Sequence, residues 1–205
     1  MPYILYTAFE PKPLSVSEQN RLEHRLGRLL LIRGLAELYS VSADEDRIGD
    51  MLSVPDSGKP YLSGYPEIRF NITHCAGLAA CAFDSEEVGV DAEMPGYFPE
   101  ILIKRALSPA EKQLLSERGI TEDLRNEWFY RLWTLKEAYV KRSGIGVDTD
   151  LTAFGFSFSE NETSPSVTCT DPGVRCFQTA LPTGHLLSLC YAKNREEPQI
   201  LPCSL

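Results

Sequence analysis

The sequence predicts an α+β protein made of two similar halves, each with one long helix packed on a small antiparallel sheet. Two long segments, at about 16–39 and about 122–142, carry apolar residues at helical spacing. Short runs rich in β-branched and aromatic residues accompany both segments. We place the division between residues 1–86 and 87–205, and because sites are often built at such interfaces, we expect one where the halves meet.

The first half is predicted from its N-terminal strand onward. Residues 2–9 are rich in aromatic and β-branched side chains, which favours a strand. The helix that follows has a capping box, because Ser15 and Glu18 have the spacing at which each satisfies a backbone group of the other. Three closely spaced apolar runs then predict an antiparallel meander: 68–73, 78–84 and 87–92.

The second half repeats this order of helix and strands. Ser108 and Pro109 begin a helix, because a capping serine is followed by proline at the first helical position. The long helix after it ends near Gly144 and Gly146, since glycine commonly terminates helices. The remaining residues are β-rich and interrupted by turns.

Composition and charge narrow the functions that the chain can have. Its 205 residues are 43% hydrophobic and 24% charged, as in ordinary globular proteins. The formal net charge of −9 argues against non-specific binding to nucleic acid or to an acidic membrane. Neither a signal peptide nor a membrane span is predicted, so we expect a cytoplasmic protein. Its six cysteines lack C-x-x-C spacing and are expected to be reduced.

The segment GVDAE at 89–93 places two acids in a predicted strand. Residues two apart in a strand point to the same face, so Asp91 and Glu93 direct their carboxylates to one point. Oxygen ligands without histidine or cysteine suit Mg²⁺ or Mn²⁺ better than zinc. A solvent-facing edge with two acids is the alternative, and the pair alone does not exclude it.

Further candidates lie on the second long helix and at the end of a strand. Glu137 and Lys141 are four residues apart and share a helix face, which by itself would also fit an exposed ion pair. Thr73 and His74 bring a hydroxyl and an imidazole side by side, which is suited to holding a phosphate. A single histidine is nevertheless more often structural.

Four motifs occur in a fixed order: GKPYL at 58–62, FNITHC at 70–75, GVDAE at 89–93 and WTLKEAYVK at 133–141. Together they resemble the 4′-phosphopantetheinyl transferases, in the longer single-chain type that activates surfactin synthetase and whose halves mimic a dimer. The resemblance implies that a monomer transfers the phosphopantetheine arm of coenzyme A to a serine of an apo acyl or peptidyl carrier protein. Adenosine 3′,5′-bisphosphate would be released.

The resemblance also implies roles for individual residues. Asp91, Glu93 and Glu137 would hold Mg²⁺, or Mn²⁺, against the pyrophosphate. Glu137 would also take the serine proton. Lys141 would stabilise charge on the pyrophosphate, with Lys136 as a helper. The coenzyme A cradle would comprise Arg25, Lys59, Pro60, Thr73, His74 and Lys141.

Two other functions use the same residues. One is a different metal-dependent enzyme that cleaves a pyrophosphate or transfers a phosphoryl group, and it would turn over nucleotide pyrophosphates without a carrier protein. The other is a non-catalytic module that binds a carrier protein or coenzyme A, and it would show affinity without product.

Overall fold

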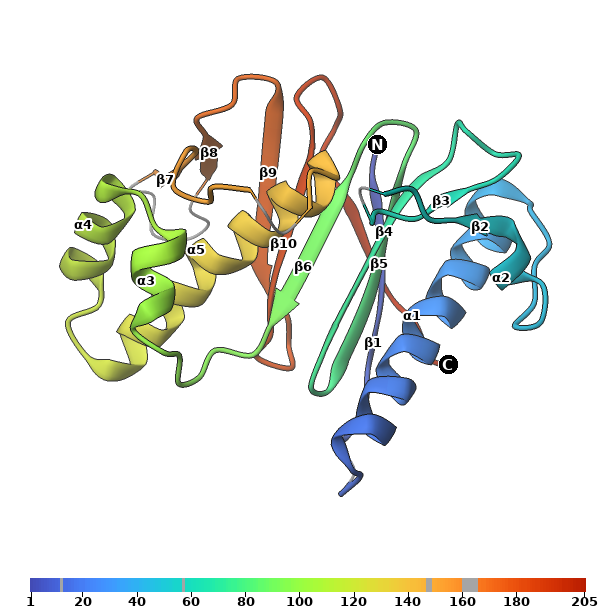
Figure 1. The fold of residues 1–205 in the computed structure, drawn as a ribbon, viewed down its shortest axis with the longest axis horizontal. Helices are drawn as coiled ribbons and strands as arrows, with labels where there is room; N and C mark the ends of the chain where they lie inside the picture. The colour runs from blue at the N-terminus through green and yellow to red at the C-terminus, as the bar shows by residue number, and fades with distance from the viewer. Residues whose placement is uncertain (12, 57, 147–148, 160–165) are drawn as a thin grey trace.

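The computed structural model describes residues 1–11, 13–56, 58–146, 149–159 and 166–205. It confirms the predicted α+β class, with one long helix on each of two sheets (Figure 1). The helices are α1 (Val16–Tyr39), α2 (Ile48–Met51), α3 (Ile101–Ala106), α4 (Pro109–Arg118) and α5 (Glu122–Ser143). The strands are β1 (Tyr3–Ala8), β2 (Leu52–Ser53), β3 (Tyr61–Leu62), β4 (Arg69–Cys75), β5 (Leu78–Asp84), β6 (Gly89–Glu93), β7 (Phe156–Phe158), β8 (Val167–Cys169), β9 (Val174–Ala180), β10 (Leu186–Ala192) and β11 (Gln199–Pro202).

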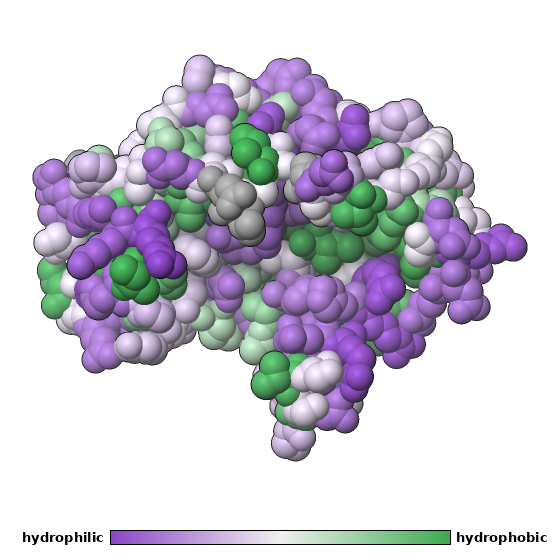
Figure 2. Space-filling view, viewed as in Figure 1, coloured by the Kyte–Doolittle hydropathy of each residue, from purple (hydrophilic) through white to green (hydrophobic). Residues whose placement is uncertain are grey.

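Helix α1 covers the first sheet, and its predicted capping box is present. The Ser15 side chain accepts a hydrogen bond from the Glu18 amide, and the Glu18 side chain accepts one from the Ser15 amide. Gly34 lets the helix approach β5 closely, because a Cβ at this position would overlap the Phe83 ring. The first turns of α1 project from the body of the molecule (Figures 1 and 2), next to the exposed Val16.

The first sheet has the strand order β11-β1-β5-β4. Strand β1 runs antiparallel to β5 and parallel to β11, with Tyr3 opposite Gln199. The last strand therefore departs from the expected division of the chain, since it belongs to the sheet of the first half. The boundary near residue 86 stays a prediction.

The predicted three-stranded meander is wrong for its third run. Strands β4 and β5 pair as expected, but β6 pairs with β10 in a second sheet of order β6-β10-β9, which α5 covers. Strands β4 and β6 meet through side chains, because Asn71 Oδ1 accepts the Val90 amide hydrogen at 2.9 Å. The Asn71 side chain therefore binds the Val90 amide in place of a backbone carbonyl of β4. The spacing of apolar residues could not indicate this contact.

The surface is mostly hydrophilic on the face shown in Figure 2, with separate hydrophobic patches. Three clusters of buried side chains form the interior: one under α1, one between the two sheets and one under α5. Among the residues described, no helix is both long enough and apolar enough to cross a bilayer.

Thiol titration of the unfolded, unreduced protein is expected to count six free cysteines. All six are free in the structure, and most are buried, as small apolar side chains are. A count of four would contradict this expectation and would point to Cys176 and Cys190. Their Sγ atoms lie 3.4 Å apart across neighbouring strands, well beyond the ~2.05 Å of a disulfide.

Candidate active site

A cavity of about 400 Å³ opens where β4, β6 and α5 meet. It lies between the two sheets, because β4 belongs to the first sheet and β6 to the second. Six of its eight lining residues carry polar groups that the sequence singles out. The lining residues are Ile72, Thr73, His74, Asp91, Glu93, Trp133, Glu137 and Lys141.

Asp91 is the most connected carboxylate of this cavity. Its Oδ1 atom lies 2.6 Å from Lys141 Nζ and accepts a hydrogen bond of 3.0 Å from the Thr73 hydroxyl. Lys141 also donates to Thr73 Oγ1 at 3.2 Å, which closes a three-membered network. Burial would lower the pKa of Lys141, but attraction by Asp91 and the neighbouring glutamates raises it, so its ammonium is charged.

The carboxylates crowd one another. Burial and repulsion from Asp91 raise the pKa of Glu93 to about 7. The same two causes raise the pKa of Glu137, against the attraction of Lys141. Three carboxylates therefore share one ammonium inside the cavity, and a further positive charge would relieve their repulsion.

The donor set fits a hard divalent cation. Asp91 Oδ2 is buried and forms no hydrogen bond within the described part of the chain, so a carboxylate oxygen is left for another partner. Every acidic group in the cavity offers oxygen, as Mg²⁺ and Mn²⁺ prefer. In the ranges that the structure covers, no group of three or more acidic, histidine or cysteine side chains is arranged so that it could hold a metal ion, so the fit rests on the chemistry of the donors and not on a preformed site.

Without a divalent cation, the free energy of unfolding is expected to fall as the pH rises through about 7. The folded-state pKa of Glu93 lies above its usual value of 4.5, so folding favours the protonated form. This contribution is complete below pH 4.5 and is lost as the folded-state carboxyl ionises, and Glu137 acts in the same direction. Urea unfolding in the presence of chelator, at several pH values, measures how the free energy of unfolding depends on pH. Glu93→Gln should make the pH dependence shallower, and an unchanged dependence would contradict the argument.

Sequence reasoning missed Glu23, which approaches the cavity from α1. Its Oε2 atom lies 3.0 Å from His74 Nδ1, and Gln19 donates to its other oxygen at 2.7 Å. Burial and the nearby His24 lower the pKa of His74, although Glu23 opposes this effect. The sequence did contain a signal that Glu23 is buried, because Glu23 is in helical register with the buried residues Gly27 and Leu30.

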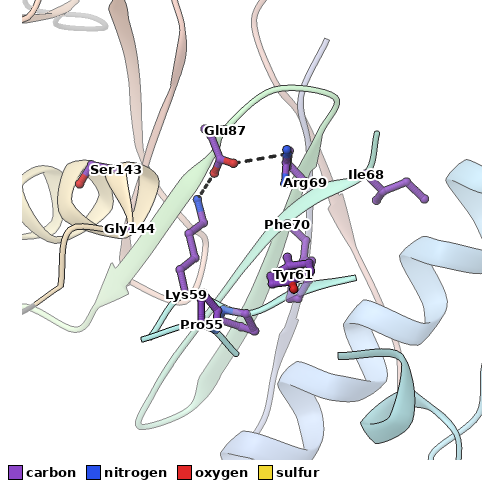
Figure 3. Close-up of a pocket in the computed structure, with 10 residues that line it drawn as sticks. Pro55, Lys59, Tyr61, Ile68, Arg69, Phe70, Glu87, Ser143 and Gly144 are labelled. Carbon is purple, nitrogen blue, oxygen red and sulfur yellow. Dashed lines mark hydrogen bonds and ion pairs between the residues drawn. The ribbon is translucent and has the colours of Figure 1, made fainter. Parts of the chain in front are cut away.

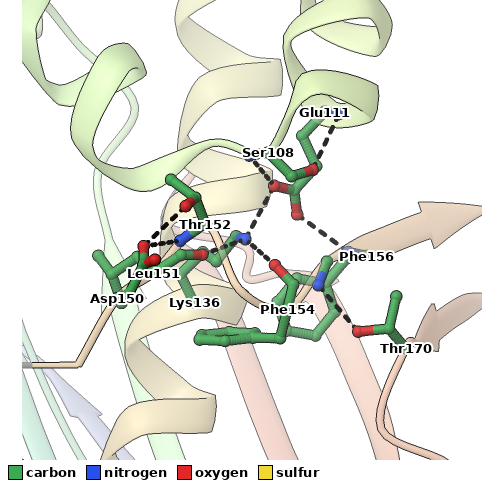
Figure 4. A network of polar contacts seen from close by, with 10 residues as sticks. Ser108, Glu111, Lys136, Asp150, Leu151, Thr152, Phe154, Phe156 and Thr170 are labelled. Carbon is green, nitrogen blue, oxygen red and sulfur yellow. Dashed lines mark hydrogen bonds and ion pairs between the residues drawn. The ribbon is translucent and has the colours of Figure 1, made fainter.

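Lys136 does not reach the cavity. It is fully buried on another side of α5, where Nζ lies 2.8 Å from Glu111 Oε2 and donates to the carbonyls of Leu151 and Phe154 (Figure 4). Glu111 in turn accepts the amide hydrogens of Ser108 and Phe156. This arrangement joins α5 to α4 and to the segment before β7.

The remaining predicted residues lie at two other cavities. Lys59 and Pro60 line one of about 300 Å³, which Figure 3 shows, together with Ser143 and Gly144 from the end of α5. Arg25 lines another of about 410 Å³ on α1, where it forms an exposed ion pair with Glu45. The structure therefore groups six predicted residues in one cavity and separates Lys136, Lys59, Pro60 and Arg25 from them.

Comparison with known proteins places the chain in a family. The profile of the 4′-phosphopantetheinyl transferase superfamily matches residues 87–190, which contain β6 and α5. A 4′-phosphopantetheinyl transferase of Bacillus subtilis is 28% identical over 181 residues, or 77% of each chain. The transferase ffp of Bacillus subtilis is 28% identical over 214 residues, or 92% of each chain. The transferase Sfp of Bacillus subtilis strain 168 is 30% identical over 129 residues, covering 63% of this chain and 55% of Sfp. The chain therefore belongs to the 4′-phosphopantetheinyl transferase superfamily.

Proposed function

We propose that this chain transfers the 4′-phosphopantetheine moiety of coenzyme A to a serine of an apo acyl or peptidyl carrier protein. The products are the holo carrier protein and adenosine 3′,5′-bisphosphate. The observation that carries the proposal is the meeting of three carboxylates, one ammonium, a threonine and a histidine in one cavity of a chain that belongs to this family. Breaking a pyrophosphate needs mainly such charged and positioning groups.

Asp91, Glu93 and Glu137 are proposed to hold Mg²⁺ or Mn²⁺. The unpartnered Asp91 Oδ2 and the raised pKa values of both glutamates support this assignment, since each would be relieved by a cation. When bound, the ion would neutralise oxygens of the pyrophosphate.

The protein side chains supply the rest of the reaction. Glu137 is proposed to accept the proton of the carrier serine, whose oxygen forms a bond to the phosphorus next to pantetheine. The bond from that phosphorus to the bridging oxygen breaks, and the nucleotide leaves with the electron pair. Lys141, already held charged beside Asp91, stabilises the negative charge on the phosphates. Burial raises the pKa of Glu137, so its carboxylate binds a proton more readily than an exposed one would.

Coenzyme A is proposed to enter from the first half of the chain. Thr73 and His74 line the cavity beside the acids, and Arg25 lies with Arg21 and Arg28 at the basic cavity on α1. These groups can bind phosphates locally although the whole chain is acidic. Both halves of one chain build the cavity, so we propose that a monomer is active.

The proposed function is tested by mass spectrometry of carrier proteins. The protein is incubated with coenzyme A, Mg²⁺ and a panel of apo acyl and peptidyl carriers, with serine-to-alanine carriers as controls. Addition of one arm to a wild-type carrier is expected, with release of adenosine 3′,5′-bisphosphate. Turnover of nucleotide pyrophosphates in the absence of a carrier would support the other enzyme class. Binding of coenzyme A without any product would support a non-catalytic module.

Chelation is expected to abolish transfer, and Mg²⁺ or Mn²⁺ is expected to restore it. The reason is that three repelling carboxylates lack a counter-ion other than Lys141 in the cavity that the structure describes. Transfer rates in excess chelator, with and without added metal, check this expectation. Full activity in excess chelator would overturn the metal assignment.

A further inference from the structure

Lys59 already uses every hydrogen that its ammonium can donate. Nζ lies 2.5 Å from Glu87 Oε2, 3.0 Å from the Val88 carbonyl oxygen and 2.9 Å from the Arg142 carbonyl oxygen. An ammonium has three N–H donors, so none is left for a substrate phosphate. The side chain is only 14% exposed, which fits a group enclosed by protein.

The three acceptors lie where the catalytic elements begin and end. Val88 immediately precedes β6, which carries Asp91, and Arg142 follows Lys141 in the last turn of α5. Lys59 itself belongs to the first half of the chain, in the segment before β3. A cation at the C-terminus of a helix is also favoured by the helix dipole. One ammonium therefore joins β6 and α5 to the other half of the protein.

These elements touch through their backbones beside Lys59. A Cβ on Gly89 would overlap the Ala138 carbonyl oxygen and the Arg142 amide nitrogen, so α5 lies directly on the start of β6. Gly144 ends α5 with a φ of +66°, and the stem of Lys59 lies close to it. A contact this close transmits small shifts, because packed backbones cannot be compressed.

Figure 3 shows how Glu87 is fixed from both sides. Its carboxylate lies between Lys59 and Arg69, and Arg69 Nε is 3.3 Å from Glu87 Oε1. Arg69 lies on β4, so the acid has a second support that does not involve α5. This gives a matched comparison, since Lys59 and Arg69 share the same carboxylate but only Lys59 also bonds the carbonyls beside β6 and α5.

We infer that Lys59 is a positioning residue for the transfer reaction, which fixes α5 against β6 and so sets the contact between Lys141 and Asp91, and that it is not a ligand of coenzyme A. This inference rests on the proposed function. It differs from the expectation drawn from the resemblance, in which Lys59 belongs to the coenzyme A cradle.

The inference is tested by comparing Lys59→Met with Arg69→Met on two substrates, coenzyme A and 3′-dephospho-coenzyme A. Misplacing Lys141 should lower kcat of Lys59→Met by about 10-fold with either substrate, because positioning acts on the reacting centre. The ratio of kcat/KM for the two substrates should stay as in the wild type. Arg69→Met should keep most of its kcat. A Lys59→Met variant that loses its preference for the 3′-phosphate, with kcat retained, would overturn the inference.

Hydrogen exchange gives a readout that does not depend on activity. The Gly144 amide donates to the Val140 carbonyl at 3.0 Å in the last turn of α5. Its exchange, and that of the neighbouring amides, should be faster in Lys59→Met than in the wild type or in Arg69→Met. Unchanged exchange in Lys59→Met would overturn the positioning role. If the wild-type protein modifies no carrier, the proposed function fails, while this measurement still tests whether Lys59 holds the helix.

Discussion

Replacing Asp91 with alanine is expected to lower kcat by about 100-fold or more at saturating coenzyme A. Asp91 Oδ1 holds Lys141 and Thr73, and Oδ2 is the buried oxygen that lacks a partner in the described ranges. The substitution would therefore remove a proposed metal ligand and release the ammonium that faces the phosphates. Steady-state rates of carrier modification, measured over a range of coenzyme A concentrations, separate the effect on kcat from that on KM.

Asp91→Asn is the matched control, because it keeps the size of the side chain and removes only the charge. It should lose nearly as much kcat as Asp91→Ala, and excess Mg²⁺ should rescue neither variant well. Glu137→Gln should behave similarly, since it would remove a metal ligand and the proposed base together. Wild-type turnover in Asp91→Ala would show that the acids of β6 form only a structural strand edge, and the mechanism would fail with it.

Replacing Lys136 with methionine is expected to lower the free energy of unfolding by about 3–5 kcal/mol. The side chains of Lys136 and Glu111 are 0% and 1% exposed, and the two charges lie 2.8 Å apart. Methionine fills the space of the lysine stem but leaves the Glu111 charge buried without its partner. Urea unfolding at neutral pH, monitored by circular dichroism, measures the change.

Two further variants make this expectation specific. Combining Lys136→Met with Glu111→Gln should recover part of the lost stability, because the second change removes the uncompensated charge. Arg33→Met breaks an exposed ion pair with Glu37 and should cost less than about 1 kcal/mol. A Lys136→Met protein with wild-type stability but a kcat as low as that of Asp91→Ala would contradict the structural role and support the catalytic one.

The periodicity of the sequence predicted which candidate site residues share one face of a single strand or helix. Alternation in β6 placed Asp91 and Glu93 together, and helical spacing placed Glu137 and Lys141 on the face that meets them. It could not separate Lys136 from these residues. Successive helix positions differ by about 100°, and which side faces the cavity depends on what packs against the helix.

The spacing of residues along the sequence could not predict contacts between distant segments. Nothing in the residues of β6 indicates that its backbone partner is β10 and that β4 meets it through Asn71. Glu23 was available from helical register, but a glutamate on a helix is usually exposed, so its burial against His74 depends on the tertiary fold. For Lys59, the turn residues around it gave its location in a loop, whereas its three acceptors come from elements that only folding brings together.

The parallel pairing of β1 with β11 has a consequence for how the protein is made. Because β11 follows β1 only after both long helices and all the strands between them, the first sheet cannot be completed until β11 has left the ribosome. Until then one edge of β1 lacks its neighbour, and unpaired strand edges invite pairing with other chains. Closing this contact joins segments nearly the whole chain apart, which slows folding. The pairing therefore ties the segment after β10 back to the sheet that α1 covers.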